Sequence, residues 1–338
     1  MGSSRPTPRA SPRSSRSTGL DAEVRRTVPV CDPRLLIVAL ALAGCEYDRV
    51  PASPAAPQLQ PALRGAPPAS LVSPLRLAVA PGARAILASD PQSDLVVELD
   101  AASLTPLGAA RPRGKPLAVG MAGGRVFVGN ATTRTIDVLH RNGRRAYSFG
   151  RDAVGYPSDL DVDANRGLLF VVDGLARDVK VFTLDGSLLR AMGGGGTFQA
   201  PIAIAVDTAR REVLVSDYGN PDGGVAAAVK IHAYDGRYLT EISGRGRCGS
   251  LGCSGGFSRP QGLTVAGGRV FLADGLLAAV LVFDRATLSP VGTLGGRSLG
   301  PPYLRLPTDV VVGRHGDLFV ASSLTGRVEV FRGAAAVP

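Results

Sequence analysis

A phrase of the form Pro-x-x-apolar-x-apolar occurs six times in this chain, and no other feature constrains its fold as strongly. The prolines lie 42, 41, 44, 59 and 47 residues apart, at Pro74, Pro116, Pro157, Pro201, Pro260 and Pro307. Apolar residues stand two apart in each phrase, as in a half-buried β-strand, and proline is tolerated at a strand's first position because no ladder hydrogen bond is needed there. We therefore expect six copies of one β-rich unit.

Each copy continues with further strands in the same order. A second apolar run ends in a small polar residue, namely Asp90, Asn130, Asp173, Asp217, Asp274 or Ser322. A third apolar run follows, from 95–99 in the first copy to 328–331 in the last. The dipeptides Asn142-Gly143, Asp185-Gly186 and Asp235-Gly236 are typical of tight hairpin turns, which would lead into a fourth strand.

Four antiparallel strands in a unit of about 40 to 45 residues are typical of a propeller blade. A lone blade would leave both faces apolar, so the blades must pack against each other and the ring must close. We therefore predict an all-β, six-bladed β-propeller of four-stranded antiparallel blades. The last copy stops soon after its third strand, so we expect residues 60–73, and 69–72 in particular, to supply the missing strand. The 43 Gly and 26 Pro also argue against long helices.

Two stretches carry a family resemblance. PSDLDVDANRGLLFVVDGLARDVKVFTLDG (157–186) and PIAIAVDTARREVLVSDYG (201–219) resemble the NHL-repeat family of six-bladed propellers. The resemblance covers residues 71–332 and implies an NHL- or TolB-like architecture. It leaves function open, because members of the family bind proteins, peptides or RNA, and related propellers hydrolyse lactones or cleave modified peptides.

Residues 1–45 have the pattern of a lipoprotein signal segment. A basic, polar stretch precedes nine apolar residues, 35–43. A helix of that length rises only about 14 Å, against a hydrocarbon core of about 30 Å, so it cannot span a bilayer. Leu42-Ala43-Gly44-Cys45 resembles a bacterial lipobox, which implies that Cys45 carries the lipid. The alternative is an internal strand with a buried cysteine.

The next segment, residues 46–70, contains six prolines among Ala, Ser and Gln, and we expect it to be an extended tether. Glu46 stands where an inner-membrane retention signal typically has Asp, so the resemblance favours the outer membrane. These features predict a lipid-anchored protein of the cell envelope that faces the periplasm or the exterior. Its propeller would span residues 71–333, with a C-terminal tail at 334–338.

The net charge of +10 does not indicate a nucleic-acid partner. Seven Arg and three acidic residues precede Cys45, so +4 of this charge belongs to the signal segment. The remaining +6 is spread over nearly 300 residues, without a basic stripe that carries aromatic residues. We expect no nucleic acid among the partners, which leaves a protein, a peptide or a glycan.

The residues that could hold a metal are poorly placed for it. His140, His232 and His315 occupy different positions in their copies, whereas a zinc site needs ligands that converge. The polar residues that close the second strands could ring a calcium ion, but residues of this type more commonly accept backbone N–H groups and organise the next loop. The inner strands add only Asp159, Asp161 and Asp309. We therefore expect no metal and no cofactor.

Residues 244–259 contain two sequence strings that mimic catalytic motifs. Gly252-Cys253-Ser254-Gly255-Gly256 matches a nucleophile elbow, and residues 244–249 match a dinucleotide-binding loop. Both motifs require a strand that leads into a helix, and we expect an irregular connection between strands here. Cys248 and Cys253 in this connection are expected to form a disulfide, because an exported protein meets an oxidising compartment.

The fourth copy has 59 residues, and its extra length lies in the loop 217–228 and the exit loop 244–259. In an up-and-down blade these two connections share one end. We therefore predict a binding surface there, made by Tyr218, Asn220, Asp222, Arg245, Arg247 and Arg259. The function expected is that of a monomeric, non-catalytic binding scaffold. The alternative is a propeller hydrolase or lyase, lactonase-like or peptide-amidating-lyase-like, with a metal at the axial mouth.

Overall fold

The computed structural model describes residues 70–80, 82, 84–245, 247–249, 252–254, 256–257, 259–296 and 303–335, and of 247–249 and 252–254 the backbone alone. The chain divides into two units, residues 1–57 and 58–338. All described residues belong to the second unit. The expected signal segment, with the expected lipid site Cys45, and most of the expected tether lie outside the described residues.

Six antiparallel sheets of the same up-and-down order make up the second unit. The first strands of the sheets are β1 (Arg76–Val79), β5 (Pro116–Ala122), β9 (Pro157–Asp163), β13 (Pro201–Asp207), β19 (Pro260–Ala266) and β23 (Pro307–Val312). The second strands are β2 (Ala85–Asp90), β6 (Arg125–Asn130), β10 (Leu168–Asp173), β14 (Glu212–Asp217), β20 (Arg269–Asp274) and β24 (Leu318–Ser322).

The third and fourth strands complete these sheets. The third strands are β3 (Leu95–Asp100), β7 (Thr135–His140), β11 (Asp178–Thr183), β15 (Ala228–Ala233), β21 (Ala279–Asp284) and β25 (Arg327–Phe331). The fourth strands are β4 (Pro106–Ala110), β8 (Arg145–Phe149), β12 (Leu188–Met192), β16 (Tyr238–Ser243) and β22 (Pro290–Gly295). The remaining elements are the hairpin β17 (Arg247–Gly249) and β18 (Gly252–Ser254) and three single 3₁₀ turns, η1 (Pro221–Gly223), η2 (Arg314–Gly316) and η3 (Ser323–Thr325).

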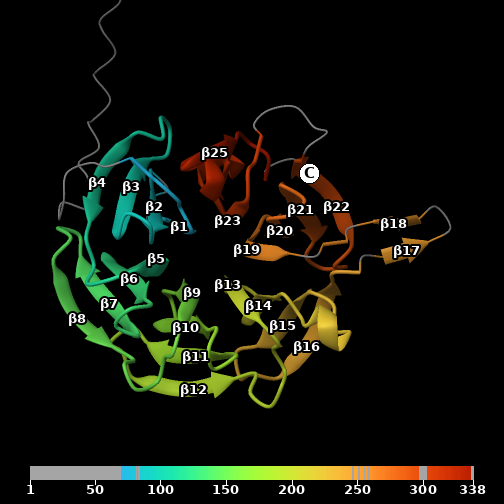
Figure 1. Ribbon diagram of the computed structural model, residues 1–338, viewed down its shortest axis with the longest axis horizontal. Coiled ribbons are helices and arrows are strands. Elements are labelled where there is room, and N and C mark those ends of the chain that lie inside the picture. Colours follow the sequence, from blue (N-terminus) through green and yellow to red (C-terminus); the bar gives the residue numbers. More distant parts are fainter. Residues whose placement is uncertain are drawn as a thin grey trace, which may run out of the picture. The chain divides into compact units, whose positions relative to one another are not determined.

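The sheets stand in a ring as blades 1 to 6 in chain order, with the first strands around the axis and the fourth strands at the circumference (Figure 1). Each first strand contacts the first strands of the two neighbouring blades, and β23 of blade 6 contacts β1 of blade 1. The predicted six-bladed all-β propeller is confirmed. No helix in the described part of the chain is long and apolar enough to cross a membrane.

The strand positions predicted from the repeat agree closely with the observed strands. Five of the six first strands begin at the proline of the phrase, where the missing N–H costs no ladder bond. The exception is β1, which begins at Arg76, two residues after its proline. The expected hairpin turns form at Gly143, Gly186 and Gly236, whose φ angles are 77°, 101° and 99°. Glycine adopts this left-handed region without the steric cost of a Cβ.

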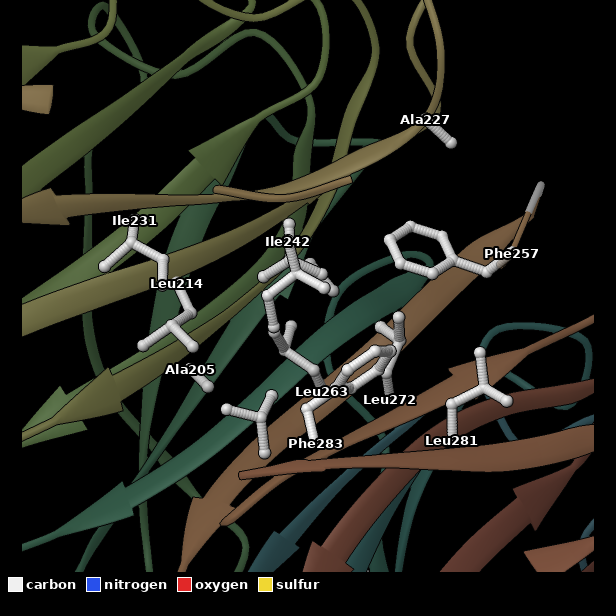
Figure 2. Packing of buried hydrophobic residues seen from close by; sticks show 13 residues of the cluster. Ala205, Leu214, Ala227, Ile231, Ile242, Phe257, Leu263, Leu272, Leu281 and Phe283 are labelled. Atoms are coloured by element: carbon white, nitrogen blue, oxygen red, sulfur yellow. The ribbon is translucent and has the colours of Figure 1, made fainter. Parts of the chain in front are cut away.

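The hydrophobic core is divided into six clusters, and each cluster joins two neighbouring blades. Between blades 4 and 5, for example, Leu214 and Ile231 of one blade face Leu263 and Phe283 of the next (Figure 2). A similar cluster, which includes Leu77 and Phe319, joins blade 6 to blade 1. The ring is thus closed by the same inter-blade packing that the repeat predicts.

Blade 6 differs from the prediction, because its sheet has three strands among the described residues. Residues 70–73 form no strand, so the expected strand at 69–72 is wrong in its described part. The physical reason is that the amides of Val72 and Ser73 donate to the carboxylate of Asp90, at 2.5 and 3.1 Å, instead of to a sheet. These residues form the connection that enters blade 1. Residues 60–69 lie outside the described part.

Polar contacts also join the last blade to the first. The Leu77 amide donates to Oδ2 of Asp309 at 2.7 Å, and the Thr308 hydroxyl donates to the Pro74 carbonyl at 3.0 Å. At the other end of the blades, the Arg332 guanidinium donates to the Ala101 and Ala102 carbonyls of blade 1. These four hydrogen bonds join blades 1 and 6 without a strand shared between their described sheets.

Candidate binding face and axial cavity

The loops between second and third strands, together with the connections that enter each first strand, meet at one end of all six blades. We call this end the loop face. The polar residue that closes each second strand organises it. Asp173, for example, accepts the amides of Gly155 and Tyr156 in the entering connection and those of Leu175 and Ala176 in the next loop, at 2.7–3.1 Å.

The same arrangement recurs around the ring, where Asp90, Asp217 and Asp274 each accept amides from two connections. Burial opposes the ionisation of Asp217, but amides of Ala200, Gln199 and Gly219 and the Lys230 ammonium hold its pKa below its usual value. The predicted structural role of these acids is confirmed. Their oxygens accept backbone N–H groups of the two connections, and Asp217 Oδ2 also accepts from Lys230 Nζ.

The predicted binding residues of blade 4 lie partly together. Asn220 and Asp222 are exposed, and Asn220 Oδ1 caps η1 by accepting the Gly223 amide at 3.1 Å. Arg245, from the exit loop, donates to the Gly224 carbonyl at 3.3 Å, so the two enlarged loops touch as expected. Tyr218 is half-buried in the same loop.

The two remaining members of the predicted set lie further along the exit loop. Arg259 is exposed where blade 5 begins, and its amide donates to Asp274. Arg247 lies in β17, where only the backbone is described. The loop face therefore continues from the enlarged loops of blade 4 onto blade 5.

The exit loop is more regular than the sequence suggested. It contains the hairpin β17–β18, which projects outward from the ring (Figure 1). Cys248 and Cys253 are directly opposite each other in this hairpin. Opposed residues of antiparallel strands have Cα atoms about 4.5 to 5.5 Å apart, which lies within the range for a disulfide. The described backbone of the two motif-like strings is strand and turn, with no helix after it.

Exposed apolar side chains concentrate on the loop face. Of the twelve large hydrophobic residues that are exposed in the described part of the chain, eight lie there: Val72, Tyr156, Leu175, Val225, Leu276, Leu277, Tyr303 and Leu324. The other four, Leu188, Leu189, Tyr238 and Val291, lie on fourth strands at the circumference. None of the twelve lies on the opposite face. Sequence reasoning missed this pattern, because apolar loop residues resemble strand residues until the strands are assigned.

A hollow of ≈ 480 Å³ opens among these apolar residues, where blade 5 meets blade 6. Leu276 and Ala278 of blade 5 line one side, and Leu324 of blade 6 and Tyr303 of the connection between the two blades line the other. Tyr303 and Leu324 are 60% and 73% exposed. Large apolar side chains left in water around a concavity are typical of a surface that another molecule covers.

A second cavity, of ≈ 290 Å³, lies on the axis between the first strands, among them Asp159, Asp161 and Asp309. Asp159 and Asp161 accept the amides of Ile204 and Val206 in the next blade at 3.0 and 2.8 Å. Burial raises the pKa of Asp161 to about 7, against these hydrogen bonds. Burial likewise raises the pKa of Asp159 and Asp309, although the Arg76 charge favours ionisation of both.

Arg76 reaches across the axis from blade 1 and is 2% exposed. Its Nη1 donates to the Thr308 carbonyl of blade 6 at 2.6 Å, and its Nη2 donates to the Ile202 carbonyl of blade 4 at 2.9 Å. Its Nε lies 3.4 Å from Oδ1 of Asp159 in blade 3. One side chain of blade 1 thus contacts three other blades. The sequence signal for it is a basic residue at a position where the other first strands carry Ala, Gly or Asp.

The three histidines do not come together. His140 ends β7 on the surface, His232 is buried in β15 between Phe198 and Tyr238, and His315 lies in η2. Within the described residues, no three His, Cys, Asp or Glu side chains are grouped as a metal site would require.

No protein-family model matches the chain, and the comparison with curated proteins gives no match. Solved structures do match. The chain is similar to a chain of hydrazine synthase from Kuenenia stuttgartiensis, with a TM-score of 0.58 and 12% identity over 79% of this chain and 97% of that one. It is also similar to the WD40 β-propeller domain of Doa1, with a TM-score of 0.55 and 14% identity over 78% and 80% of the two chains.

A third similar structure comes from a nidogen/laminin complex, with a TM-score of 0.51 and 14% identity over 66% of this chain and 80% of that one. At such low identities these likenesses establish the propeller fold and nothing about activity.

Proposed function

We propose that this propeller is a non-catalytic binding scaffold, anchored to the cell envelope by a lipid on Cys45, and that its loop face holds the partner. The observation that carries the proposal is the concentration of exposed apolar side chains on that face. The resemblance to the NHL-repeat family supports the same role. A protein or peptide fits better than a glycan, because a hollow flanked by leucines and a tyrosine favours apolar ligand groups.

The charge of the loop face further restricts the chemistry expected of the partner. Its exposed basic side chains include Arg134, Arg151, Arg177 and Arg305, and its exposed acids are Asp152 and Asp222. The buried aspartates that close its second strands accept backbone amides, and Asp217 and Asp178 are paired with Lys230 and Lys180. A partner surface with apolar residues among carboxylates would complement this face in both shape and charge.

The binding face is tested by cross-linking in cells that produce the full-length chain, followed by mass spectrometry. The variant Leu276→Ser/Leu277→Ser/Leu324→Ser removes apolar contacts from the loop face. The control Leu188→Ser/Leu189→Ser/Val291→Ser makes the same kind of change at the circumference. We expect a partner that cross-links to wild type and control to be lost from the loop-face variant. A cross-linked set that is the same for all three proteins would refute the proposal.

The anchor is tested separately with Cys45→Ser. We expect the wild-type chain to enter the detergent phase on phase separation and to carry the added mass of acyl groups on Cys45. The variant should stay in the aqueous phase. Identical partitioning of the two proteins would refute the lipid anchor but leave the binding face untouched.

Metal analysis addresses the hydrolase or lyase alternative. Such an enzyme would hold a metal at the axial mouth, where the described acids instead accept backbone amides. We expect the purified chain to contain no tightly bound zinc or calcium. One equivalent of either ion, retained through gel filtration and released by Asp161→Asn, would favour the enzyme over the scaffold.

A further inference from the structure

The hairpin that joins β7 to β8 in blade 2 presents a dense group of basic side chains, three of which are arginines. His140, Arg141, Arg144 and Arg145 lie within six residues of chain, and all four are exposed. Together with Asn142 and Ala146 they line an open hollow of ≈ 600 Å³. This hairpin lies at the end of the blades opposite the loop face, because it connects a third to a fourth strand.

The turn that carries these basic side chains is held in a defined shape. Its ends are joined by the bond from the His140 amide to the Arg144 carbonyl, 2.9 Å long. Within it, the Gly143 amide donates to the His140 carbonyl, and Asn142 Oδ1 accepts the Arg144 amide at 3.0 Å. A fourth arginine, Arg125, is fixed beside the hairpin, where it donates to the Tyr147 hydroxyl at 3.0 Å.

Two sibling blades carry an acid at this end that blade 2 lacks. Asp163 and Asp207 end the first strands of blades 3 and 4 and form ion pairs with Arg166 and Arg210. Blade 2 has Ala122 at that position. Blade 2 therefore lacks the carboxylate that neutralises arginines at this end of two sibling blades.

The end of the third strand likewise lacks an acid that two other blades carry. Asp100 and Asp284 end the third strands of blades 1 and 5, and Asp284 lies opposite Arg269 in its sheet. Blade 2 has His140 at that position, opposite Arg125. Within the part of the chain that the structure describes, none of Arg125, Arg141, Arg144 and Arg145 forms an ion pair.

We propose that this hairpin is a binding site for clustered phosphate groups. Guanidinium groups bind phosphate oxygens through paired hydrogen bonds, and three or more of them side by side match a ligand with several phosphates. No large apolar side chain lines the hollow, so recognition rests on charge density. That favours phosphate over an acidic peptide, whose carboxylates are more widely spaced. The phosphates could belong to a soluble ligand or to lipid headgroups.

The test is binding of the full-length chain to tripolyphosphate and to oligoglutamate by calorimetry, and to vesicles of neutral lipid with and without phosphatidylglycerol. All proteins carry Cys45→Ser, so that a lipid on Cys45 contributes nothing. The test variant is Arg141→Gln/Arg144→Gln/Arg145→Gln. The control, Arg190→Gln/Arg211→Gln/Arg237→Gln, removes the same charge from exposed positions of blades 3 and 4 outside the loop face. Thermal melting verifies that both variants fold, and the single variant Arg144→Gln serves if the triple does not.

We expect wild type and control to bind alike and the hairpin variant to bind about tenfold or more weakly. Binding to tripolyphosphate with no preference for anionic vesicles would support a soluble ligand, and the reverse would support lipid headgroups. Equal losses in the two variants would refute the site. The site would also be refuted if the chain bound neither tripolyphosphate nor anionic vesicles. Binding of oligoglutamate as tight as that of tripolyphosphate would refute it as well. None of these outcomes depends on the loop face.

Discussion

The amide of Leu77 in the first blade donates a hydrogen bond to the Asp309 carboxylate in the last blade, over 2.7 Å. The bond joins residues 232 positions apart in the sequence. Gly262 makes room for it, since a Cβ there would lie 1.7 Å from Oδ1 of Asp309. Together with the apolar cluster between blades 1 and 6, it closes the ring where the described sheet of blade 6 has only three strands.

Arg76 should be the most costly single residue on the axis to replace. Arg76→Met removes two hydrogen bonds to carbonyls and leaves the buried Asp159 without its cation. Breaking a buried pair in this way typically costs about 3 to 5 kcal/mol. We expect a loss of that size in urea unfolding, reduced when Asp159→Asn is added. An exposed control, Arg134→Met, should change stability by less than about 0.5 kcal/mol. A cost for Arg76→Met no larger than this would argue against an axial role.

Stability should fall as the pH rises from 5 to 8. Unfolded Asp161 ionises near its ordinary value of 3.8, whereas the native residue keeps its proton up to about 7. Between these two pKa values the native state binds more protons than the unfolded state. The stabilisation that protonated Asp161 gives the native state below pH 4 is therefore lost as the pH approaches 7. The slope reaches at most about 1.4 kcal/mol per pH unit for one group.

The raised pKa of Asp309 acts in the same direction. Melting temperatures of wild type and Asp161→Asn across this range provide the measurement. The variant should show a shallower fall, and Asp222→Asn, on the surface, should not. Parallel curves for wild type and Asp161→Asn would show that Asp161 is ionised in the native state.

Asp173→Ala should loosen two connections at once. The change leaves four amides, of Gly155, Tyr156, Leu175 and Ala176, without their acceptor. A cost of about 1 to 3 kcal/mol is expected, since water replaces only part of the bonding. Hydrogen exchange should accelerate in both connections. Asp222→Ala, at an exposed position, is the control, and unchanged exchange at Tyr156 would contradict the assigned role of Asp173.

The predicted disulfide can be checked by mass. Protein from an oxidising compartment should be lighter by two hydrogen atoms than the reduced form, and a peptide pair should link Cys248 to Cys253. Closing so short a loop contributes about 2 kcal/mol in the chain-entropy model. Cys253→Ser should lower stability by no more than that. Free thiols at both positions in exported protein would refute the bond.

The sequence predicted the strands well because each blade repeats one local pattern. Alternating apolar residues after a proline indicate which side of a strand is buried, and an Asn-Gly or Asp-Gly dipeptide indicates a tight turn. The error at residues 70–72 has a local cause. Leu71 and Val72 look like part of a strand, but the Val72 amide is taken by Asp90, and only the structure reveals that competing acceptor.

The candidate sites were harder to predict, because they depend on contacts across the ring. In the sequence Arg76 is one polar residue in a strand. In the folded ring its guanidinium donates to the carbonyls of Ile202 and Thr308 in two other blades. The charge on the blade 2 hairpin was visible in the sequence, yet it became informative only when Ala122 and His140 were aligned with the aspartates of sibling blades.

The most direct test of the proposed function compares two tyrosines of similar exposure. Tyr303 on the loop face is 60% exposed, and Tyr238 at the circumference is 49% exposed. Hydroxyl-radical footprinting would be carried out on intact cells and on the purified chain. We predict that Tyr303 is protected in cells relative to the purified chain, whereas Tyr238 reacts alike in both. Equal reactivity of Tyr303 in the two preparations would contradict a partner on the loop face.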